Sequence, residues 1–322
     1  MTDSMKIAAF GELLLRLAAD KNGIAATRSF DACYGGTEAN VLACMKSFGH
    51  NVKYVSALPN TELGEGAIAH LMSFGIDISS VLRCGDGMGI YFVENGSASR
   101  GSNVVYMRKQ SEFAKLNPND FDCDKIFENV GLFHISGISF ALSDSSRRTA
   151  FKLVEEAKLR GIPVSFDFNY RSKLWDIPTA KPYLREAAAM ADILLASTLD
   201  LTTFLDTTEE SFYDKYDSSV LIVRDRKILA PDRHCVKVAA YKKADGHIES
   251  YTSENVEFAV KEKIGGGDAF DGAILHKLLS GAPLKEAVDF AIAAFAFKAT
   301  ILGDTFIGNE NDVNNFAKYI GE

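Results

Sequence analysis

The chain has 322 residues, of which 47% are hydrophobic and 24% charged, the composition of an ordinary globular protein with a sizeable core. Its 43 acidic and 35 basic side chains give a net charge of -8, which argues against general nucleic-acid binding because that function needs a basic face. The five cysteines are scattered without a CxxC pair, and no segment resembles a targeting signal or a membrane span. We therefore expect a cytoplasmic protein without nucleic-acid or membrane partners.

The first quarter of the chain alternates between predicted strands and helices. The predicted elements are strands over 6–12, 13–17 and 27–34, a helix over 37–48, a strand over 52–57 and a helix over 63–74. Glycines mark the boundaries: Gly35 and Gly36 lead into the first helix, and Gly49 and Gly75 follow the two helices. Strands and helices are therefore predicted to alternate in this part of the chain.

The pattern changes between residues 88 and 108. Residues 89–94 and 103–108 predict two strands joined by a Gly/Ser-rich turn, with no helix between them. Together with the short strands before residue 35, this hairpin predicts a small second sheet that closes over a ligand as a lid. We place the lid strands at about 12–34 and 88–110.

The alternation resumes at residue 132. The predicted strands cover 132–135, 163–168, 192–195 and 220–224, with helices over 145–160 and around 182–190, then shorter strands within 236–260 and helices over 268–279, 284–302 and 311–320. This order predicts an α/β fold, a doubly wound and mostly parallel sheet flanked by helices, with ligands at the carboxyl ends of the strands. We expect a single domain over 1–322 that carries the lid.

Three consecutive glycines, Gly265, Gly266 and Gly267, run into Asp268 at the predicted start of a helix. Glycine lets the backbone come close to a ligand, and the free N–H groups and the positive end of the helix dipole attract an anion. Asp268 would repel a phosphate, but it suits a base that takes a proton from a hydroxyl as that hydroxyl attacks phosphorus. An ordinary helix N-cap is the alternative interpretation of Asp268.

A second polar cluster follows the predicted strand over 163–168. Asp167, Asn169 and Arg171 are spaced at i, i+2 and i+4, so they share one side and face the crevice where ligands bind. The alternative is a capped loop with an exposed salt bridge.

The lid hairpin carries Tyr91, Tyr106 and Arg108, which could close over a small polar ligand, although tyrosine in strands often only packs. Arg108 and Arg171 in one pocket would favour an anionic substrate, because guanidinium groups bind carboxylates bidentately. The sequence contains no GxxxxGK[ST], no GxGxxG after the first strand and no GxSxG, which argues against P-loop NTPases, Rossmann dehydrogenases and α/β-hydrolases.

On these residues the chain resembles the ribokinase-like (PfkB-type) sugar kinases from end to end. The resemblance rests on Gly35-Gly36-Thr37-Glu38-Ala39-Asn40 and on the Gly-x-Gly-Asp-x-Phe pattern over 265–270, in that order and about 230 residues apart. Within the family it is most similar to the 2-keto-3-deoxygluconate kinases. The signs are the Glu-Ala-Asn form of the first motif, the polar segment over 167–175, Tyr106-x-Arg108, the GGGDAF spelling and Gly303-Asp304.

The resemblance implies a kinase that transfers the γ-phosphoryl group of ATP, with Mg²⁺ as cofactor, to a primary hydroxyl of a sugar acid. It implies that Asp268 deprotonates the hydroxyl and that the amides of Gly265, Gly266 and Gly267 hold the charge that develops on the transferred group. The implied substrate-binding residues are Gly36, Asn40, Tyr91, Tyr106, Arg108, Asn169, Arg171 and Asp304.

On the nucleotide side the sequence departs from the family. The usual Asn-x-x-Glu is Ser197-Thr198-Leu199-Asp200 here, and the resemblance implies that Ser197 and Asp200 lie at the nucleotide, with Asp200 reaching Mg²⁺ through water. The usual Lys-x-Gly is Arg224-Asp225-Arg226, so Arg224 is assigned to the nucleotide phosphates together with Gly265 and Gly267. A salt bridge from Arg224 to Asp225 or a neighbour is the alternative.

Two other functions stay open. A kinase of a neutral sugar or nucleoside (fructose, ribose or adenosine) is disfavoured because two unpaired arginines would be poorly used there. A non-catalytic sugar-acid sensor on the same fold is supported only by the altered segment over 197–200. We also expect a homodimer through the lid, because an exposed hairpin often pairs with a partner chain.

Overall fold

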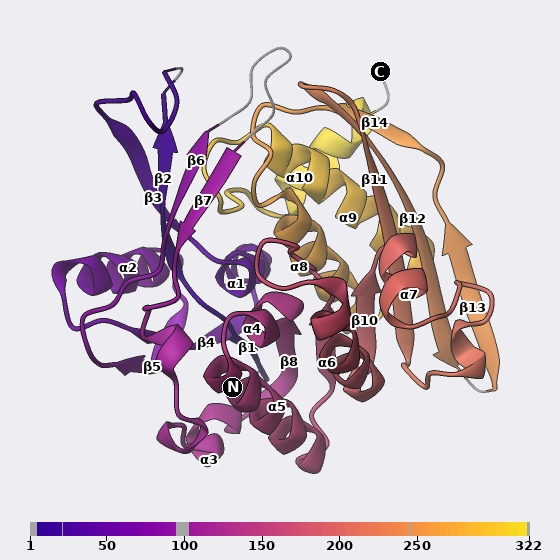
Figure 1. The fold of residues 1–322 in the computed structure, drawn as a ribbon. Coiled ribbons are helices and arrows are strands. Elements are labelled where there is room, and N and C mark those ends of the chain that lie inside the picture. Colours follow the sequence, from indigo (N-terminus) through magenta and orange to yellow (C-terminus); the bar gives the residue numbers. More distant parts are fainter. Residues whose placement is uncertain (1–4, 21, 95–102, 245, 321–322) are drawn as a thin grey trace.

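The computed structural model describes residues 5–20, 22–94, 103–244 and 246–320. The ribbon has a body of helices around a large sheet, with a small sheet standing out from one side (Figure 1). The predicted turn of the lid hairpin, residues 95–102, lies outside the described residues. In the described ranges no helix is both long and apolar enough to cross a lipid bilayer.

The body is built on one sheet with the strand order β13-β12-β11-β10-β9-β8-β1-β4-β5, and β14 pairs with β12. Its strands are β1 (Lys6–Phe10), β4 (Asn51–Leu58), β5 (Asp77–Arg83), β8 (Val130–Ser136), β9 (Val164–Asp167), β10 (Ile193–Ala196), β11 (Val220–Ala230), β12 (Arg233–Ala244), β13 (His247–Thr252) and β14 (Val256–Ala259). Neighbouring strands from β5 to β11 are parallel, whereas β12 pairs antiparallel with β11, β13 and β14. The predicted mostly parallel sheet is confirmed.

Helices cover both faces of this sheet. One face carries α1 (Thr37–Ser47), α2 (Glu62–Ser73), α8 (Gly266–Leu279), α9 (Leu284–Ala299) and α10 (Glu310–Phe316), and the other carries α3 (Cys123–Phe127), α4 (Gly137–Ala141), α5 (Asp144–Leu159), α6 (Ile177–Met190) and α7 (Thr198–Phe204). In β1, Ile7 and Ala9 belong to the first core and Ala8 and Phe10 to the second. Side chains of a strand alternate between faces, so a strand buried on both sides is apolar throughout.

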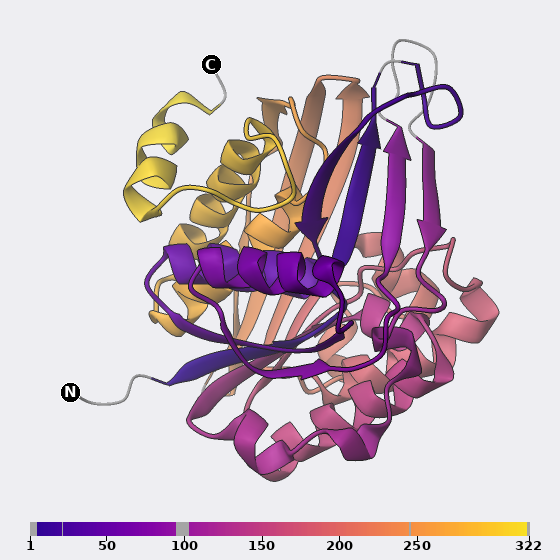
Figure 2. The same ribbon diagram turned by 90° about the vertical axis from the view of Figure 1, so that its left-hand side faces the viewer.

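The second sheet consists of β2 (Leu14–Ala19), β3 (Phe30–Gly35), β6 (Ile90–Glu94) and β7 (Asn103–Met107), in the order β3-β2-β6-β7. The pairs β2–β3 and β6–β7 are antiparallel, and β2 pairs parallel with β6. Apart from Gly35, the last residue of β3, all four strands fall within the two segments predicted for the lid. Figure 2 shows them projecting above the body at the upper right.

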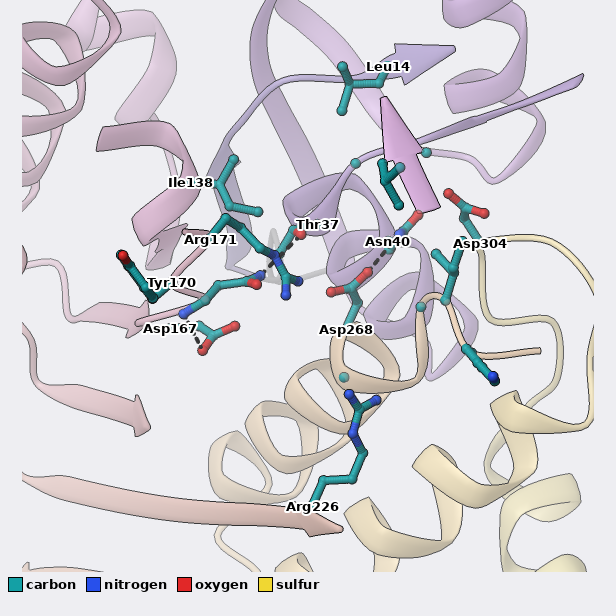
Figure 3. A pocket seen from close by; sticks show the side chains of 18 of the residues that line it. Leu14, Thr37, Asn40, Ile138, Asp167, Tyr170, Arg171, Arg226, Asp268 and Asp304 are labelled. Carbon is teal, nitrogen blue, oxygen red and sulfur yellow. Dashed lines mark hydrogen bonds between the residues drawn. The ribbon is translucent and has the colours of Figure 1, made fainter. Parts of the chain in front are cut away.

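Five elements differ from the sequence-based expectation. β5, α3, α4 and α7 were not predicted, because a half-buried edge strand and helices of five or seven residues carry little periodic apolar signal. β11 was expected to end at Arg224 but continues to Ala230, since it pairs along this length with β12. The extension carries Arg226 beside the start of α8 (Figure 3).

Candidate active site

A cavity of about 650 Å³ lies between the lid and the carboxyl ends of the parallel strands. Asp167 and Ala196, the last residues of β9 and β10, line one wall, and Tyr91 and Tyr106 reach it from the lid. Nearly all of the site residues expected from sequence also line it. They are Gly36, Asn40, Tyr91, Tyr106, Arg108, Asn169, Arg171, Ser197, Asp200, Arg224, Gly265, Gly267, Asp268 and Asp304. Gly266 does not, because it is buried beside Phe295.

The start of α8 has the geometry of an anion site. Gly265 is the N-cap with φ 77° and ψ -7°, in the left-handed region that favours glycine, and a Cβ there would lie 1.8 Å from the main-chain oxygen of Asp304. The first N–H groups of a helix have no acceptor inside it, and no side chain in the described ranges caps these. Because Gly265 is the N-cap, the interpretation of Asp268 as an ordinary cap is wrong.

Asp268 lies in the first turn of α8 and is half-buried. Asn40 of α1 donates a hydrogen bond from Nδ2 to Asp268 Oδ2 at 2.7 Å and so fixes the carboxyl group. Burial raises the pKa of Asp268 to about 6, although the hydrogen bond from Asn40 acts in the opposite direction. At neutral pH the group is therefore an ionised but comparatively basic carboxylate, as a general base requires.

Arg171 faces Asp268 across the cavity (Figure 3). Its exposed guanidinium has no hydrogen-bond or salt-bridge partner in the described part of the chain, and its charge lowers the pKa of Asp268. Asn169, in the left-handed region at φ 37°, donates from Nδ2 to Thr37 Oγ1 at 3.2 Å. This hydrogen bond connects the loop after β9 to Thr37, the first residue of α1. Arg171, the unpaired cation, lies two residues further along the same loop.

Arg108, unlike Arg171, is paired with a carboxylate. The expectation that both guanidinium groups are unpaired is therefore wrong for Arg108. Arg108 is buried, and its Nε donates to Glu12 Oε2 at 2.7 Å. Ser111 Oγ donates to the other oxygen of Glu12. A buried charge needs a partner, so this pair fixes the base of β7 and leaves Arg108 less free to bind a ligand. Sequence reasoning missed Glu12, which lies two residues after the end of β1.

Tyr91 and Asp304 contact each other. The hydroxyl of Tyr91 donates to Asp304 Oδ2 at 2.8 Å, and Asp304 Oδ1 lies 2.9 Å from Nε of Arg16. Burial raises the pKa of Asp304 even though the charge of Arg16 lowers it. Arg16 also lies 3.5 Å from Glu262 through Nη1. This buried network joins the lid strands to the loop before α8, and its members Arg16 and Glu262 were not predicted.

On the nucleotide side, Ser197 and Asp200 cap α7. Ser197 Oγ accepts from the N–H of Asp200, while Asp200 Oδ2 accepts from the N–H and Oγ of Ser197 at 2.8 and 2.6 Å. This is a reciprocal capping box. Burial raises the pKa of Asp200. The two residues line the cavity as expected, with one oxygen of Asp200 committed to the cap.

Arg224 forms the salt bridge that was the alternative to phosphate binding, but with a different partner. Its Nη1 donates to Asp271 Oδ1 at 2.8 Å and to the main-chain oxygen of Gly267 at 3.1 Å. Asp225 instead accepts from Thr198.

Two other cations line the cavity near Arg224. Arg226 and Lys263 have no salt-bridge partner among the described residues, and Arg226 points toward the first turn of α8 (Figure 3). Neither residue was assigned a role from sequence, because the sequence does not show whether the charge of an arginine or a lysine is paired with a carboxylate.

Carboxylates near these cations suit a nucleotide-bound Mg²⁺. Within 5–20, 22–94, 103–244 and 246–320, no group of three His, Cys, Asp or Glu side chains could hold a metal alone. Mg²⁺ in phosphoryl-transfer sites needs only one or two carboxylates, since phosphates and water complete its shell. Asp167 and Asp200 line the cavity, and Asp271 beside them has a buried Oδ2 to which no other described residue donates a hydrogen bond. The donor set therefore fits Mg²⁺ delivered with a nucleotide.

A doubly wound sheet with a lid, an anion site at a helix start and a basic carboxylate beside that site define a phosphoryl-transfer enzyme for small hydroxylated ligands. The chain belongs to the pfkB family of carbohydrate kinases, whose family model matches residues 4–222. The family predicted from the two glycine motifs and the class of enzyme are confirmed.

Relatives and solved structures agree with this family. The chain is 29% identical over 317 residues to 2-dehydro-3-deoxygalactonokinase from Haloferax volcanii, covering 96% of this chain and 95% of that protein. Its fold matches 2-dehydro-3-deoxygluconokinase from Thermotoga maritima with a TM-score of 0.92 and 31% identity, covering 98% and 99%. An E. coli protein termed ribokinase II, in complex with ATP and Mg²⁺, matches in fold with a TM-score of 0.80 and 22% identity, covering 98% and 99%.

The raised pKa of Asp268 predicts that Asp268→Asn stabilises the protein at alkaline pH. The folded state holds this proton up to about pH 6, whereas an ordinary aspartate releases it near 3.8. Wild-type stability therefore falls as pH rises through this window, and the asparagine variant escapes the loss. Thermal midpoints of both proteins at about pH 4 and about pH 8 measure the effect.

The control is Asp232→Asn, which removes an exposed carboxylate outside the cavity. Its midpoint should differ from wild type by the same amount at both pH values. An Asp268→Asn variant that loses stability relative to wild type as pH rises would contradict the assigned environment.

Proposed function

We propose that the protein is an ATP-dependent kinase of a 2-keto-3-deoxy sugar acid, with 2-keto-3-deoxygluconate (2-dehydro-3-deoxygluconate) as the first candidate. The observation that carries this proposal is the pair of Asp268 and Arg171, a basic carboxylate and an unpaired guanidinium on opposite sides of one cavity. The first suits a hydroxyl that must lose a proton, and the second a substrate carboxylate. The relatives named for keto-deoxy sugar acids support the same substrate class.

In the proposed reaction Asp268 takes the proton of the primary hydroxyl. The hydroxyl oxygen then forms a bond to the γ-phosphorus, the bond from that phosphorus to the β,γ-bridging oxygen breaks, and ADP leaves. Asn40 keeps the carboxyl group oriented through its 2.7 Å hydrogen bond. The amides at the start of α8, from Gly265 to Gly267, hold the charge that develops on the transferred group.

The nucleotide side uses the remaining charges. Arg226 and Lys263, which have no salt-bridge partner in the described ranges, would hold the phosphates, and Arg224 would support them while fixing Gly267. Asp167 and Asp200 would hold Mg²⁺, with Asp200 acting through water. Bound Mg²⁺ would neutralise phosphate charge and orient the phosphates.

The substrate side would combine cations with hydrogen-bonding groups. Arg171 would bind the carboxylate and Asn169 a neighbouring oxygen. Tyr106 and the Tyr91–Asp304 pair would contact sugar hydroxyls from the lid side, and Gly36 would let the ligand approach the start of α1, where a Cβ would overlap the main chain of Glu12. Arg108, paired with Glu12, would act mainly by positioning β7. Closure of the lid would exclude water that otherwise hydrolyses ATP.

The rival with structural support is a kinase of a neutral sugar or nucleoside, because the pairing of Arg108 with Glu12 removes one of the two arguments against it. Arg171 still opposes it. The assay is Mg²⁺-dependent ADP release with 2-keto-3-deoxygluconate, 2-keto-3-deoxygalactonate, fructose, ribose and adenosine in separate reactions. We expect turnover only with the keto-deoxy acids. Turnover on a neutral substrate alone would replace the proposed substrate, and no turnover would favour a sensor.

The same assay tests the base. Asp268→Asn should reduce kcat by about 10² to 10⁴ while binding is retained. In the wild type, kcat/KM should fall as pH drops through about 6, because the base becomes protonated. Near-normal turnover by Asp268→Asn would falsify its role.

Arg171→Gln and Arg226→Gln form a matched pair for the two halves of the cavity. Arg171→Gln should raise KM for the sugar acid about 10- to 100-fold, since a charged hydrogen-bond pair is lost, and leave KM for ATP unchanged. Arg226→Gln should raise KM for ATP instead. Initial rates with each substrate varied in turn measure both constants. Equal effects of the two variants on both KM values would rule out the assignment of Arg171 to the sugar acid and Arg226 to ATP.

We also propose that two copies pair through the lid. β7 is an edge strand of the lid sheet, and its Val105 and Met107 are 43% and 62% exposed. Light scattering should give twice the 35.1 kDa mass of the chain, and Met107→Lys should shift it toward the monomer. Ile228→Lys, at an equally exposed position on β11, is the control and should leave the mass unchanged. A monomeric wild type would end this proposal.

A further inference from the structure

A lysine is completely buried beneath the start of α8. Lys298, in the last turn of α9, is 0% exposed, and its Nζ donates to the main-chain oxygens of Ile264, Ile301 and Gly303 at 3.0, 3.1 and 2.8 Å. A lysine ammonium has three N–H donors, so each has one carbonyl acceptor. In the described part of the chain no carboxylate forms a salt bridge with it. A buried cation held by main-chain oxygens alone is unusual, because a charge that leaves water is normally paired with an opposite charge.

The three carbonyl groups belong to the two segments that form the anion site. Ile264 directly precedes Gly265, the N-cap of α8, and Ile301 and Gly303 lie in the loop that leads to Asp304. These segments touch, since a Cβ on Gly265 would lie 1.8 Å from the main-chain oxygen of Asp304 and 3.1 Å from Lys298 Cε. The ammonium therefore joins both segments at the point where the backbone turns into α8.

Without a cation, the three oxygens would face one another with like partial charges and no donor. Main-chain carbonyl oxygens that converge on one point replace the hydration shell of an alkali cation, as in ion-selective filters. We call the three converging carbonyl oxygens the cage. In this chain the positive charge belongs to a side chain of α9, so it occupies the cage at any salt composition. Burial lowers the pKa of Lys298, while Glu262, Asp304 and Asp268 act against this and favour the charged form.

We propose that Lys298 is a positioning residue whose ammonium serves as a built-in monovalent cation, holding the anion site of α8 in its working geometry. The inference rests on the proposed kinase function, because it assigns how the phosphoryl-binding turn is kept in place. Two consequences follow: the wild-type rate is independent of alkali cations, and a chain lacking the ammonium acquires such a dependence.

The first test uses the wild-type protein. ADP release with ATP and the keto-deoxy acid is measured in tetramethylammonium chloride and, at equal ionic strength, in KCl, NaCl or NH₄Cl. Equal rates are expected, since tetramethylammonium is too large for the cage and the cage is already filled. Activation of the wild type by several-fold in KCl or NH₄Cl would overturn the proposal.

The second test is Lys298→Met, which keeps an apolar stem of similar length. In tetramethylammonium chloride its kcat should fall about 10- to 100-fold, as for a disturbed oxyanion site, with KM for the sugar acid little changed. KCl or NH₄Cl should restore part of kcat and raise the thermal midpoint of the variant but not of the wild type. A variant with wild-type kcat, or one that neither cation affects, contradicts the proposal.

Lys53→Met is the matched control. Lys53 of β4 is 2% exposed, and its Nζ also donates to main-chain oxygens, of Lys125 and Ile126 at 2.7 and 3.2 Å, but these two residues do not line the cavity, whereas Ile264 does. Its loss should lower the thermal midpoint without a cation-dependent change in kcat. A kcat of Lys53→Met that responds to KCl as Lys298→Met does would show a general salt effect and overturn the proposal.

If Lys298→Met does not fold, Lys298→Leu takes its place, because it also removes every N–H donor from the three carbonyl oxygens, and the same outcomes decide. Failure of the kinase function is distinguishable from failure of this inference. A wild type without turnover on any substrate would count against the function alone, since the thermal midpoints report occupation of the cage without turnover. Stabilisation of the position-298 variant by KCl, absent in wild type, then still supports the cage.

Discussion

The start of α8 is the constraint on which the cavity depends. Gly265 turns in the left-handed region directly against the main-chain oxygen of Asp304, and this close approach decides where the first N–H groups of the helix point. Asp268 lies in the first turn of the same helix, so the helix fixes the distance between its carboxylate and these N–H groups. Arg224 holds the oxygen of Gly267 and Lys298 that of Ile264. The anion site is thus a backbone structure clamped by two cations.

The charges around the cavity divide by whether they have partners. Arg16, Arg108 and Arg224 are paired with Asp304, Glu12 and Asp271, and these pairs join the lid and the strand ends to the body. Arg171, Arg226 and Lys263 line the same cavity without a salt-bridge partner among the described residues. The charge of a paired guanidinium is balanced by a carboxylate of the fold, whereas an unpaired guanidinium is available to a ligand anion. The division separates charges that are paired within the fold from those to which we assign ligand binding.

Much of this arrangement was predictable from local patterns. The alternation of strands and helices predicted the doubly wound sheet, the interruption between residues 88 and 108 predicted the small second sheet, and the glycine run before Asp268 predicted the start of α8. Pairing was not predictable. Arg108 and Arg171 look alike in the sequence, yet only Arg108 lies near a buried carboxylate, and Glu12 is separated from it by 96 positions. Arg224 was likewise assigned to phosphates, although Asp271 holds it.

The sequence by itself determined the chemistry that the protein carries: a helix start without side-chain caps, a carboxylate in its first turn, and the order of strands and helices. These are local properties, because glycine torsions, helix ends and apolar periodicity depend on near neighbours. Only the tertiary structure decided which charges are free, which are paired, and that Lys298 lies against Ile264 and Gly265 at the start of α8. Such relations join segments far apart in the chain, and packing of the whole fold sets them.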